Sequence, residues 1–167
     1  HLYRIPTTGL RFFTVYGPYG RPDMAYYKFT ESILNNKKID VYNNGDMKRD
    51  FTYIDDIVEG IVKVINKIPR PKKNDHSLAK APYNLYNIGN NNPVELKRFI
   101  AAIENSTGIT AIKNDLPMQP GDVQKTYADV DALINLIGFK PNTSVEEGIE
   151  KFVIWFREYM GCCINQN

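Results

Sequence analysis

Short β-rich runs alternate with helical segments along this chain, and this alternation most constrains its fold. Residues Thr8–Val15, Ile39–Tyr42, Phe51–Ile54 and Tyr83–Ile88 have the composition typical of short strands, and turn residues flank most of them. Most of the segments that follow these runs carry apolar residues at helical spacing over about 10 to 15 residues. Strands that alternate with helices of this length tend to pair in parallel, so we predict an α/β fold. The chain shows no internal repeat.

The helix boundaries carry their own signals. We predict helices over Ala25–Leu34, from Asp55 or Asp56 to Pro69, from Asn92 to Gly108, from Asp129 to Gly138 and from Ser144 to about Tyr159. In the last four, an Asp, Asn or Ser stands where its side chain can accept from free backbone N–H groups. Ser144 is followed three residues later by Glu147, which completes a capping box.

Composition excludes several classes of protein. With 21 Lys plus Arg and 19 Asp plus Glu in 167 residues, the formal charge is 21 − 19 = +2, so we expect no basic surface for nucleic acid. Hydrophobic residues make up 43% of the chain, which is enough for a sizeable core and argues against disorder. Apolar runs stay shorter than the roughly 18 residues that a membrane span needs, so we expect no membrane span.

The ends of the chain give two further expectations. The chain begins at His1 and runs directly into a strand pattern, which suggests an excerpt from a longer protein, although a processed N-terminus would look the same. Because no signal-peptide pattern precedes the strand, we expect a cytoplasmic location. Cys162 and Cys163 are adjacent and lack a partner pattern for a disulfide or a metal site, so we predict reduced thiols and no bound metal.

The residues alone offer no catalytic constellation. The two histidines stand at the first position and in the basic loop, and neither is part of a nucleophile–base pattern. The carboxylate pairs Asp55-Asp56 and Glu146-Glu147 fall in predicted first turns of helices, where capping explains them. The turn Gly17–Gly20 follows a strand but matches neither the dinucleotide nor the P-loop fingerprint.

Two arginines form the remaining candidate for a binding site. Arg21 lies in the Gly- and Pro-rich loop Tyr16–Met24, and Arg49 follows an Asn-Gly turn. A guanidinium group binds phosphate oxygens in pairs, and a diphosphate needs two or more such donors. Either arginine could equally form an ordinary surface ion pair. Tyr42, just before the turn, could stack on a base or belong to the core.

Five ordered segments of the chain resemble a known family. They read LRFFTVYGPYGRPDMA, IDVYNNGDMKRDFTYIDDIVEGI, YNIGNNNPVEL, MQPGDVQKTYADV and GFKPNT. In this order and spacing they resemble the C-terminal half of the nucleotide-sugar epimerases of the extended short-chain dehydrogenase/reductase superfamily. The likeness is greatest to UDP-glucuronate 4-epimerases, including those of bacterial capsular polysaccharide synthesis, and it covers nearly the whole chain.

The resemblance implies a fold and a division of the chain. The α/β fold would combine the C-terminal part of a Rossmann-like sheet with a smaller substrate-binding lobe. Residues 1–18, 51–69 and 83–92 would form the edge of the Rossmann lobe, and residues 19–50 and 93–167 would form most of the substrate lobe. The Gly-rich dinucleotide loop and the catalytic Tyr-x-x-x-Lys helix would lie upstream, so residues 1–167 would be an inactive C-terminal fragment.

The resemblance also implies an activity. In this family NAD takes the C4 hydride of UDP-glucuronate while a tyrosinate removes the 4-hydroxyl proton, and the 4-keto intermediate is reduced on its other face to UDP-galacturonate. This chain would supply mainly UDP-sugar binding and no catalytic residue, and the full-length enzyme would be a homodimer. A non-catalytic UDP-sugar-binding module and a related dehydratase or epimerase are the alternatives.

Four residues are implied on the sugar and cofactor side. Thr14 matches a position that faces the sugar, and its hydroxyl would help to bind the glucuronate carboxylate. Phe13 matches a position near the nicotinamide. Arg21 and Arg49 match the arginines that hold the diphosphate.

Five residues are implied on the nucleotide side. Asp40, Val41 and Tyr42 match the segment beside the uracil. Gln119 and Asp122 match the nucleotide-binding turn. Some relatives carry Arg where Gln119 stands, so one contact with a phosphate charge would be missing here.

Overall fold

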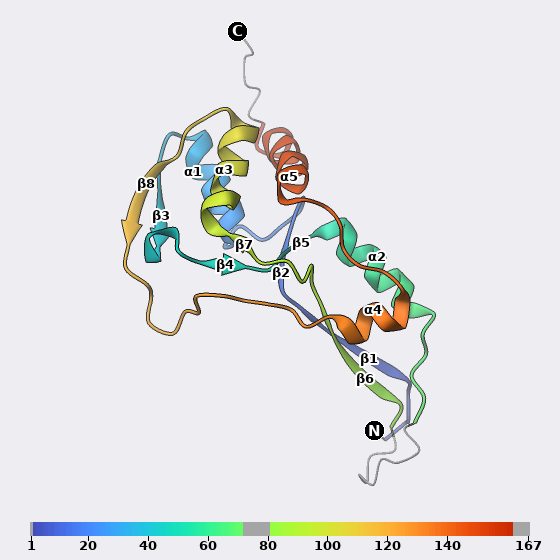
Figure 1. Ribbon diagram of the computed structural model, residues 1–167. Coiled ribbons are helices and arrows are strands. Elements are labelled where there is room, and N and C mark those ends of the chain that lie inside the picture. Colours follow the sequence, from blue (N-terminus) through green and yellow to red (C-terminus); the bar gives the residue numbers. More distant parts are fainter. Residues whose placement is uncertain (1, 72–80, 162–167) are drawn as a thin grey trace.

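The computed structural model describes residues 2–71 and 81–161 (Figure 1). Its helices are α1 (Ala25–Leu34), α2 (Ile54–Ile65), α3 (Leu96–Thr107), α4 (Asp131–Ile137) and α5 (Val145–Tyr159), with the short 3-10 helix η1 (Asn43–Gly45). Its strands are β1 (Thr7–Phe12), β2 (Thr14–Tyr16), β3 (Lys38–Tyr42), β4 (Lys48–Arg49), β5 (Phe51–Tyr53), β6 (Tyr83–Ile88), β7 (Val94–Glu95) and β8 (Ile112–Leu116). Both histidines, and Cys162 and Cys163 with their predicted reduced thiols, lie outside the described residues.

The strands associate in pairs, most of them parallel as predicted. β1 pairs with β6, β2 with β5 and β3 with β8 in parallel, whereas β4 and β7 are antiparallel. The single strand predicted over Thr8–Val15 is wrong in one respect, because it is divided at Phe13. There β1 ends opposite Ile88 and β2 begins opposite Phe51, while the Phe13 N–H donates to the Ile88 carbonyl at 3.3 Å. The chain therefore changes its pairing partner at Phe13.

The buried side chains form two clusters. The larger cluster lies among β2, β3, β5 and helices α1, α3 and α5. The smaller cluster contains Ile57, Val64, Ile88 and Leu133, and it lies between the β1–β6 pair and helices α2 and α4. In Figure 1, α1, α3 and α5 lie together toward one end of the molecule, and β1 and β6 extend toward the other. The division of the chain between a Rossmann edge and a substrate lobe stays a prediction.

Tyr16 on β2 lies at the centre of the larger cluster. Its side chain is 1% exposed, and its ring meets four aromatic rings edge to face at centroid distances between 5.7 and 6.3 Å. Those rings belong to Tyr26, Phe51, Tyr53 and Phe99. The Tyr16 hydroxyl donates to the Ser144 carbonyl at 3.3 Å, which connects β2 to the start of α5.

Buried tyrosines make the fold sensitive to high pH. Burial, and secondarily the negative charge of Asp56, raises the pKa of Tyr16, and burial is also the main cause of the raised pKa of Tyr26. Because the unfolded tyrosines ionise at a pH of about 10 while the folded ones stay neutral, ionisation favours the unfolded state. We expect the free energy of unfolding to fall as pH rises above about 10. Urea denaturation at pH 7, 9 and 10.5 measures this, and a Tyr16→Phe variant should lose less stability over the same range.

Several predicted helix boundaries are confirmed. Helix α1 has the predicted bounds. The Ser144 hydroxyl accepts from the Glu147 N–H at 3.2 Å and caps α5 as predicted, and Gly108 and Gly138 end α3 and α4 in the left-handed conformation. Within the described part of the chain, no helix combines the length and the apolar character needed to cross a membrane.

The predicted N-cap of α2 is wrong. The helix begins at Ile54 with Tyr53 as its N-cap and with no capping side chain. The Asp56 carboxylate instead accepts from the Thr143 N–H at 3.1 Å, so a contact with a distant loop replaces the local cap. The helix also ends at Ile65, one turn before Pro69.

The predicted start of α3 is wrong as well, and α4 begins slightly later than predicted. The Asn92 segment does not open a helix, because Val94–Glu95 pairs with β4 and the Leu96 N–H donates to the Met47 carbonyl at 2.9 Å. Tertiary pairing thus overrides the local capping signal. The N-cap of α4 is Val130, but Asp129 Oδ1 accepts from the Asp131 N–H at 3.3 Å, so Asp129 still satisfies a free N–H group at the start of the helix, as predicted.

Candidate functional site

Two adjoining cavities lie beside β2 and share Met24 and Tyr26 in their walls. We call the first the Arg49 cavity, with a volume of about 540 Å³, and the second the Arg21 cavity, with a volume of about 500 Å³. Each volume is within the range of small-molecule sites. Because they share wall residues, the two cavities are placed to hold adjacent parts of one ligand.

The Arg49 cavity brings together five residues that the sequence suggested for the UDP-sugar. They are Thr14, Asp40, Tyr42, Arg49 and Asp122. The other residues around this cavity are Asp23, Met24, Ala25, Tyr26, Phe29, Met47, Phe51 and Leu96. An apolar wall with a few polar groups that converge on one space is typical of a small-molecule site.

The pleat of β3 selects which of its side chains reach this cavity. Successive side chains on a strand point to opposite faces. Ile39 and Val41 are therefore buried in the larger cluster, whereas Asp40 and Tyr42 line the cavity. The parallel strand β8 supports this arrangement, because the Asn114 amide donates to the Asp40 carboxylate at 2.8 Å.

Arg49 is held in a fixed orientation by the segment that contains Asp122. Its Nη2 donates to Asp122 Oδ1 at 2.8 Å, and its Nη1 donates to the carbonyls of Lys48 and Gln124 at 3.1 and 3.2 Å. The side chain is only 17% exposed. A guanidinium group has five N–H donors, and these contacts with described residues account for three hydrogen bonds. The orientation leaves donor capacity for an anion in the cavity.

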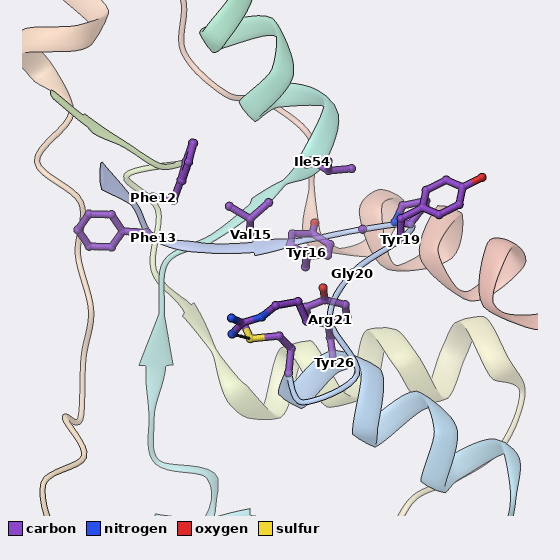
Figure 2. Close-up of a pocket in the computed structure, with 12 residues that line it drawn as sticks. Phe12, Phe13, Val15, Tyr16, Tyr19, Gly20, Arg21, Tyr26 and Ile54 are labelled. Carbon is purple, nitrogen blue, oxygen red and sulfur yellow. Dashed lines mark hydrogen bonds between the residues drawn. The ribbon is translucent and has the colours of Figure 1, made fainter. Parts of the chain in front are cut away.

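Arg21 is placed more loosely, on the loop before α1. Its Nη2 lies 3.2 Å from the Asp23 carboxylate and 3.4 Å from the Met24 sulfur, and its side chain is 74% exposed. The same loop carries Tyr19, whose ring lies 5.2 Å from the Trp155 ring on α5. Figure 2 shows the side chains of Arg21 and Tyr19 pointing in opposite directions from this loop. Phe13 also lines the Arg21 cavity.

Two of the suggested residues line neither cavity. Val41 is buried, so any contact with a ligand would involve its main chain. Gln119 is exposed, and its carbonyl accepts from the Asp122 N–H at 3.2 Å in the turn that presents the Asp122 carboxylate. The roles suggested for both residues stay predictions.

The sequence interpretation missed other residues of the site. Met24 stands between the two cavities, and Met47 and Leu96 complete the apolar wall of the Arg49 cavity. Only the position of Met24, directly before a predicted helix and after a Gly- and Pro-rich loop, was a signal that could have pointed to it.

An α/β fold with an arginine-bearing cavity beside parallel strands defines a broad class of ligand-binding proteins. Comparison makes the class specific, because the model of the NAD dependent epimerase/dehydratase family matches residues 1–89 of the 167. The chain belongs to this family. The predicted α/β class and the family resemblance are therefore confirmed.

Similar sequences come from several bacteria. The chain is 56% identical over 165 residues to Protein CapI of Staphylococcus aureus, which covers 95% of this chain and 49% of that protein. It is 50% identical over 163 residues to the probable UDP-glucuronate 4-epimerase of Rhizobium meliloti, which covers 93% of this chain and 48% of that protein. The chain thus spans about half the length of these curated relatives.

A solved structure of similar fold likewise matches this chain over about half of its own length. The UDP-glucuronic acid 4-epimerase of Bacillus cereus, in complex with UDP-glucuronic acid and NAD, superposes with a TM-score of 0.79 at 30% sequence identity. The match covers 94% of this chain and 47% of that chain.

Proposed function

We propose that the protein is an NAD-dependent UDP-sugar 4-epimerase that converts UDP-glucuronate to UDP-galacturonate, and that this chain binds the nucleotide sugar. The Arg49 cavity carries the proposal, because residues from positions 14 to 122 that the family resemblance assigns to the UDP-sugar line one space. A relative named as a probable UDP-glucuronate 4-epimerase and a neighbour that holds UDP-glucuronic acid support this choice of substrate.

The two cavities offer a suitable group for each of the three parts of the substrate, which are the diphosphate, the uracil and the sugar. Arg49, held by Asp122, would bind the diphosphate with its remaining N–H groups, and Arg21 would bind from the adjoining cavity. Asp40 and Tyr42 would contact the uracil with a hydrogen-bond acceptor and a ring face. The Thr14 hydroxyl would donate to the sugar carboxylate.

The residues of the Arg21 cavity fit the nicotinamide end of NAD. Phe12, Val15 and Ile54 give this cavity an apolar wall, which suits a flat ring, and Phe13 lines it with its ring pointing away (Figure 2). When bound, NAD supplies hydride transfer at C4 of the sugar. The described residues of this chain would orient the sugar against that wall and exclude water from it. We propose that the catalytic tyrosine and lysine belong to the other half of the enzyme, since this chain spans about half the length of its relatives.

The proposal extends to assembly and location. We propose a homodimer, on the basis of the family resemblance, and we keep the cytoplasmic location that the sequence pattern suggested. Light scattering on the protein as its gene encodes it tests the dimer, which a monomeric mass would contradict. Cell fractionation tests the location.

Product analysis tests the proposed function. The protein as its gene encodes it is incubated with NAD and, separately, with UDP-glucuronate, UDP-glucose or UDP-N-acetylglucosamine. We expect UDP-galacturonate from UDP-glucuronate, and much slower conversion of the other two. Binding without conversion of any of the three would indicate a non-catalytic module, and a dehydrated product would indicate a dehydratase.

Thr14 should contribute to the choice of substrate. Replacing Thr14 with Val keeps the shape of the side chain but removes the hydroxyl, so we expect the KM for UDP-glucuronate to rise about tenfold through loss of a hydrogen bond to a charged group. Steady-state kinetics measure this. Thr52→Val is the matched control, because the buried Thr52 hydroxyl lacks a partner among the described residues and lines neither cavity. Equal KM values for Thr14→Val and the wild type would contradict the role given to Thr14.

A further inference from the structure

Asp50, between β4 and β5, is a fully buried carboxylate that none of the proposed roles uses. Its side chain is 0% exposed and accepts three backbone N–H groups. These belong to Asn90, Asn91 and Ala128, at 3.1, 3.1 and 3.0 Å. Burying a charge is costly unless hydrogen bonds satisfy it, so this carboxylate strongly favours one arrangement of the two segments, Asn90–Asn91 and the one that ends at Ala128, that it joins to the β4–β5 connection.

One of those segments presents Asp122 to Arg49. Residues 122–128 run beside β4, where the Lys48 N–H donates to the Gln124 carbonyl at 2.9 Å and the Thr126 N–H donates to the Lys48 carbonyl at 3.1 Å. This segment has no helix or strand of its own and is largely exposed. Asp50 anchors its buried end, because Asp50 accepts from Ala128 and its own N–H donates to the Thr126 hydroxyl at 3.0 Å.

Asp50, Ala128 and Phe13 surround Gly89 closely. Gly89, directly after β6, leaves no free space here, since a Cβ on Gly89 would lie 2.8 Å from the Ala128 Cβ. The same Cβ would lie 3.5 Å from both Asp50 Oδ2 and the Phe13 Cβ. Phe13 lines the Arg21 cavity, whereas Arg49 and Asp122 line the Arg49 cavity. Asp50 therefore lies close to Phe13 of the Arg21 cavity and also holds the segment that carries Asp122 of the Arg49 cavity.

We propose that Asp50 is a positioning residue for nucleotide-sugar binding. It touches no ligand itself. It fixes the segment that carries Asp122, and through Asp122 it fixes the guanidinium group of Arg49. This inference rests on the proposed function, because it takes Arg49 as the diphosphate-binding group.

Calorimetric titration with UDP tests the inference in the protein as its gene encodes it, at a temperature where every variant is folded. Asp50→Asn keeps the shape but turns an amide N–H₂ toward backbone donors, so we expect the Kd for UDP to rise about tenfold or more. Asp56→Asn is the matched control, because Asp56 is also a buried carboxylate that accepts a backbone N–H but lines neither cavity. Its Kd should stay within about twofold of the wild type.

The other outcomes separate the positioning role of Asp50 from the proposed function. An unchanged Kd for Asp50→Asn, or an equal loss in both variants, would overturn the positioning role alone. A wild-type protein that does not bind UDP would overturn the proposed function and the inference with it.

If Asp50→Asn does not fold, a second pair of variants tests the positioning role of Asp50 through the segment that it holds. Gly89→Ala should push the Ala128 segment away without changing any charge, and so weaken UDP binding. The double variant Gly89→Ala with Ala128→Gly removes the clashing Cβ and should restore most of the affinity. Normal binding by Gly89→Ala, or no recovery in the double variant, would overturn the inference.

Discussion

Replacing Arg49 with alanine is expected to raise the Kd for UDP about 10- to 100-fold, because a hydrogen bond to a charged group contributes roughly 1.5–3 kcal/mol. Arg49 is the cation of the site whose geometry is fixed. Its side chain is 17% exposed, and it makes hydrogen bonds to Asp122 and to two carbonyls. Because the side chain is already held in place, it loses little conformational entropy when a ligand binds. Calorimetric titration of the protein as its gene encodes it with UDP measures the effect.

The control for this variant is Arg98→Ala. Arg98 makes a bidentate pair with Glu146 at 2.8 and 2.9 Å and lines neither of the two cavities. Removing it should leave the Kd unchanged. Arg49→Lys should give an intermediate Kd, because an ammonium keeps the charge but lacks the fork that matches phosphate oxygens. If Arg49→Ala binds UDP as tightly as Arg98→Ala does, Arg49 does not hold the diphosphate.

Replacing Tyr16 with alanine is expected to lower the free energy of unfolding by about 3–5 kcal/mol, the range for losing a buried aromatic ring. The ring is packed edge to face against four others at the centre of the larger cluster, so the cavity left behind cannot collapse without moving several elements. Urea denaturation of wild type and variant at pH 7 measures the difference.

Tyr16→Phe separates the ring from the hydroxyl. It removes only the 3.3 Å hydrogen bond to the Ser144 carbonyl, so we expect a loss of about 1 kcal/mol or less. Equal losses in the two variants would mean that the link to α5, and not the aromatic packing, holds this part of the core together.

The local sequence pattern was sufficient to predict an element whose structure depends only on its own residues. Helix α1 and the Ser144 cap of α5 are of this kind, since their signals lie within a few residues. It failed where distant partners decide. The division of the first strand at Phe13 depends on two different neighbours, β6 and β5, and the apolar run itself is continuous across it. Asn92 has the sequence of a helix cap, but pairing with β4 extends the chain there instead.

The candidate site shows the same limit. Period-two alternation along β3 explains why Asp40 and Tyr42 share a cavity and Val41 does not. The contact between Arg49 and Asp122 joins residues 73 positions apart, so no local pattern could reveal it, and only the family resemblance suggested both. Asp50 follows Arg49 directly, yet its importance depends on three backbone groups at positions 90, 91 and 128.

The most direct measurement of the central claim is equilibration from both epimers. The protein as its gene encodes it is incubated with NAD and either UDP-glucuronate or UDP-galacturonate, and the two sugars are quantified over time. A C4 epimerase must bring both mixtures to the same final ratio, and this is the result that we predict. Two results would contradict it: mixtures whose ratios stay different after long incubation with protein at a concentration near that of the substrate, or a product in which the sugar has lost its carboxylate.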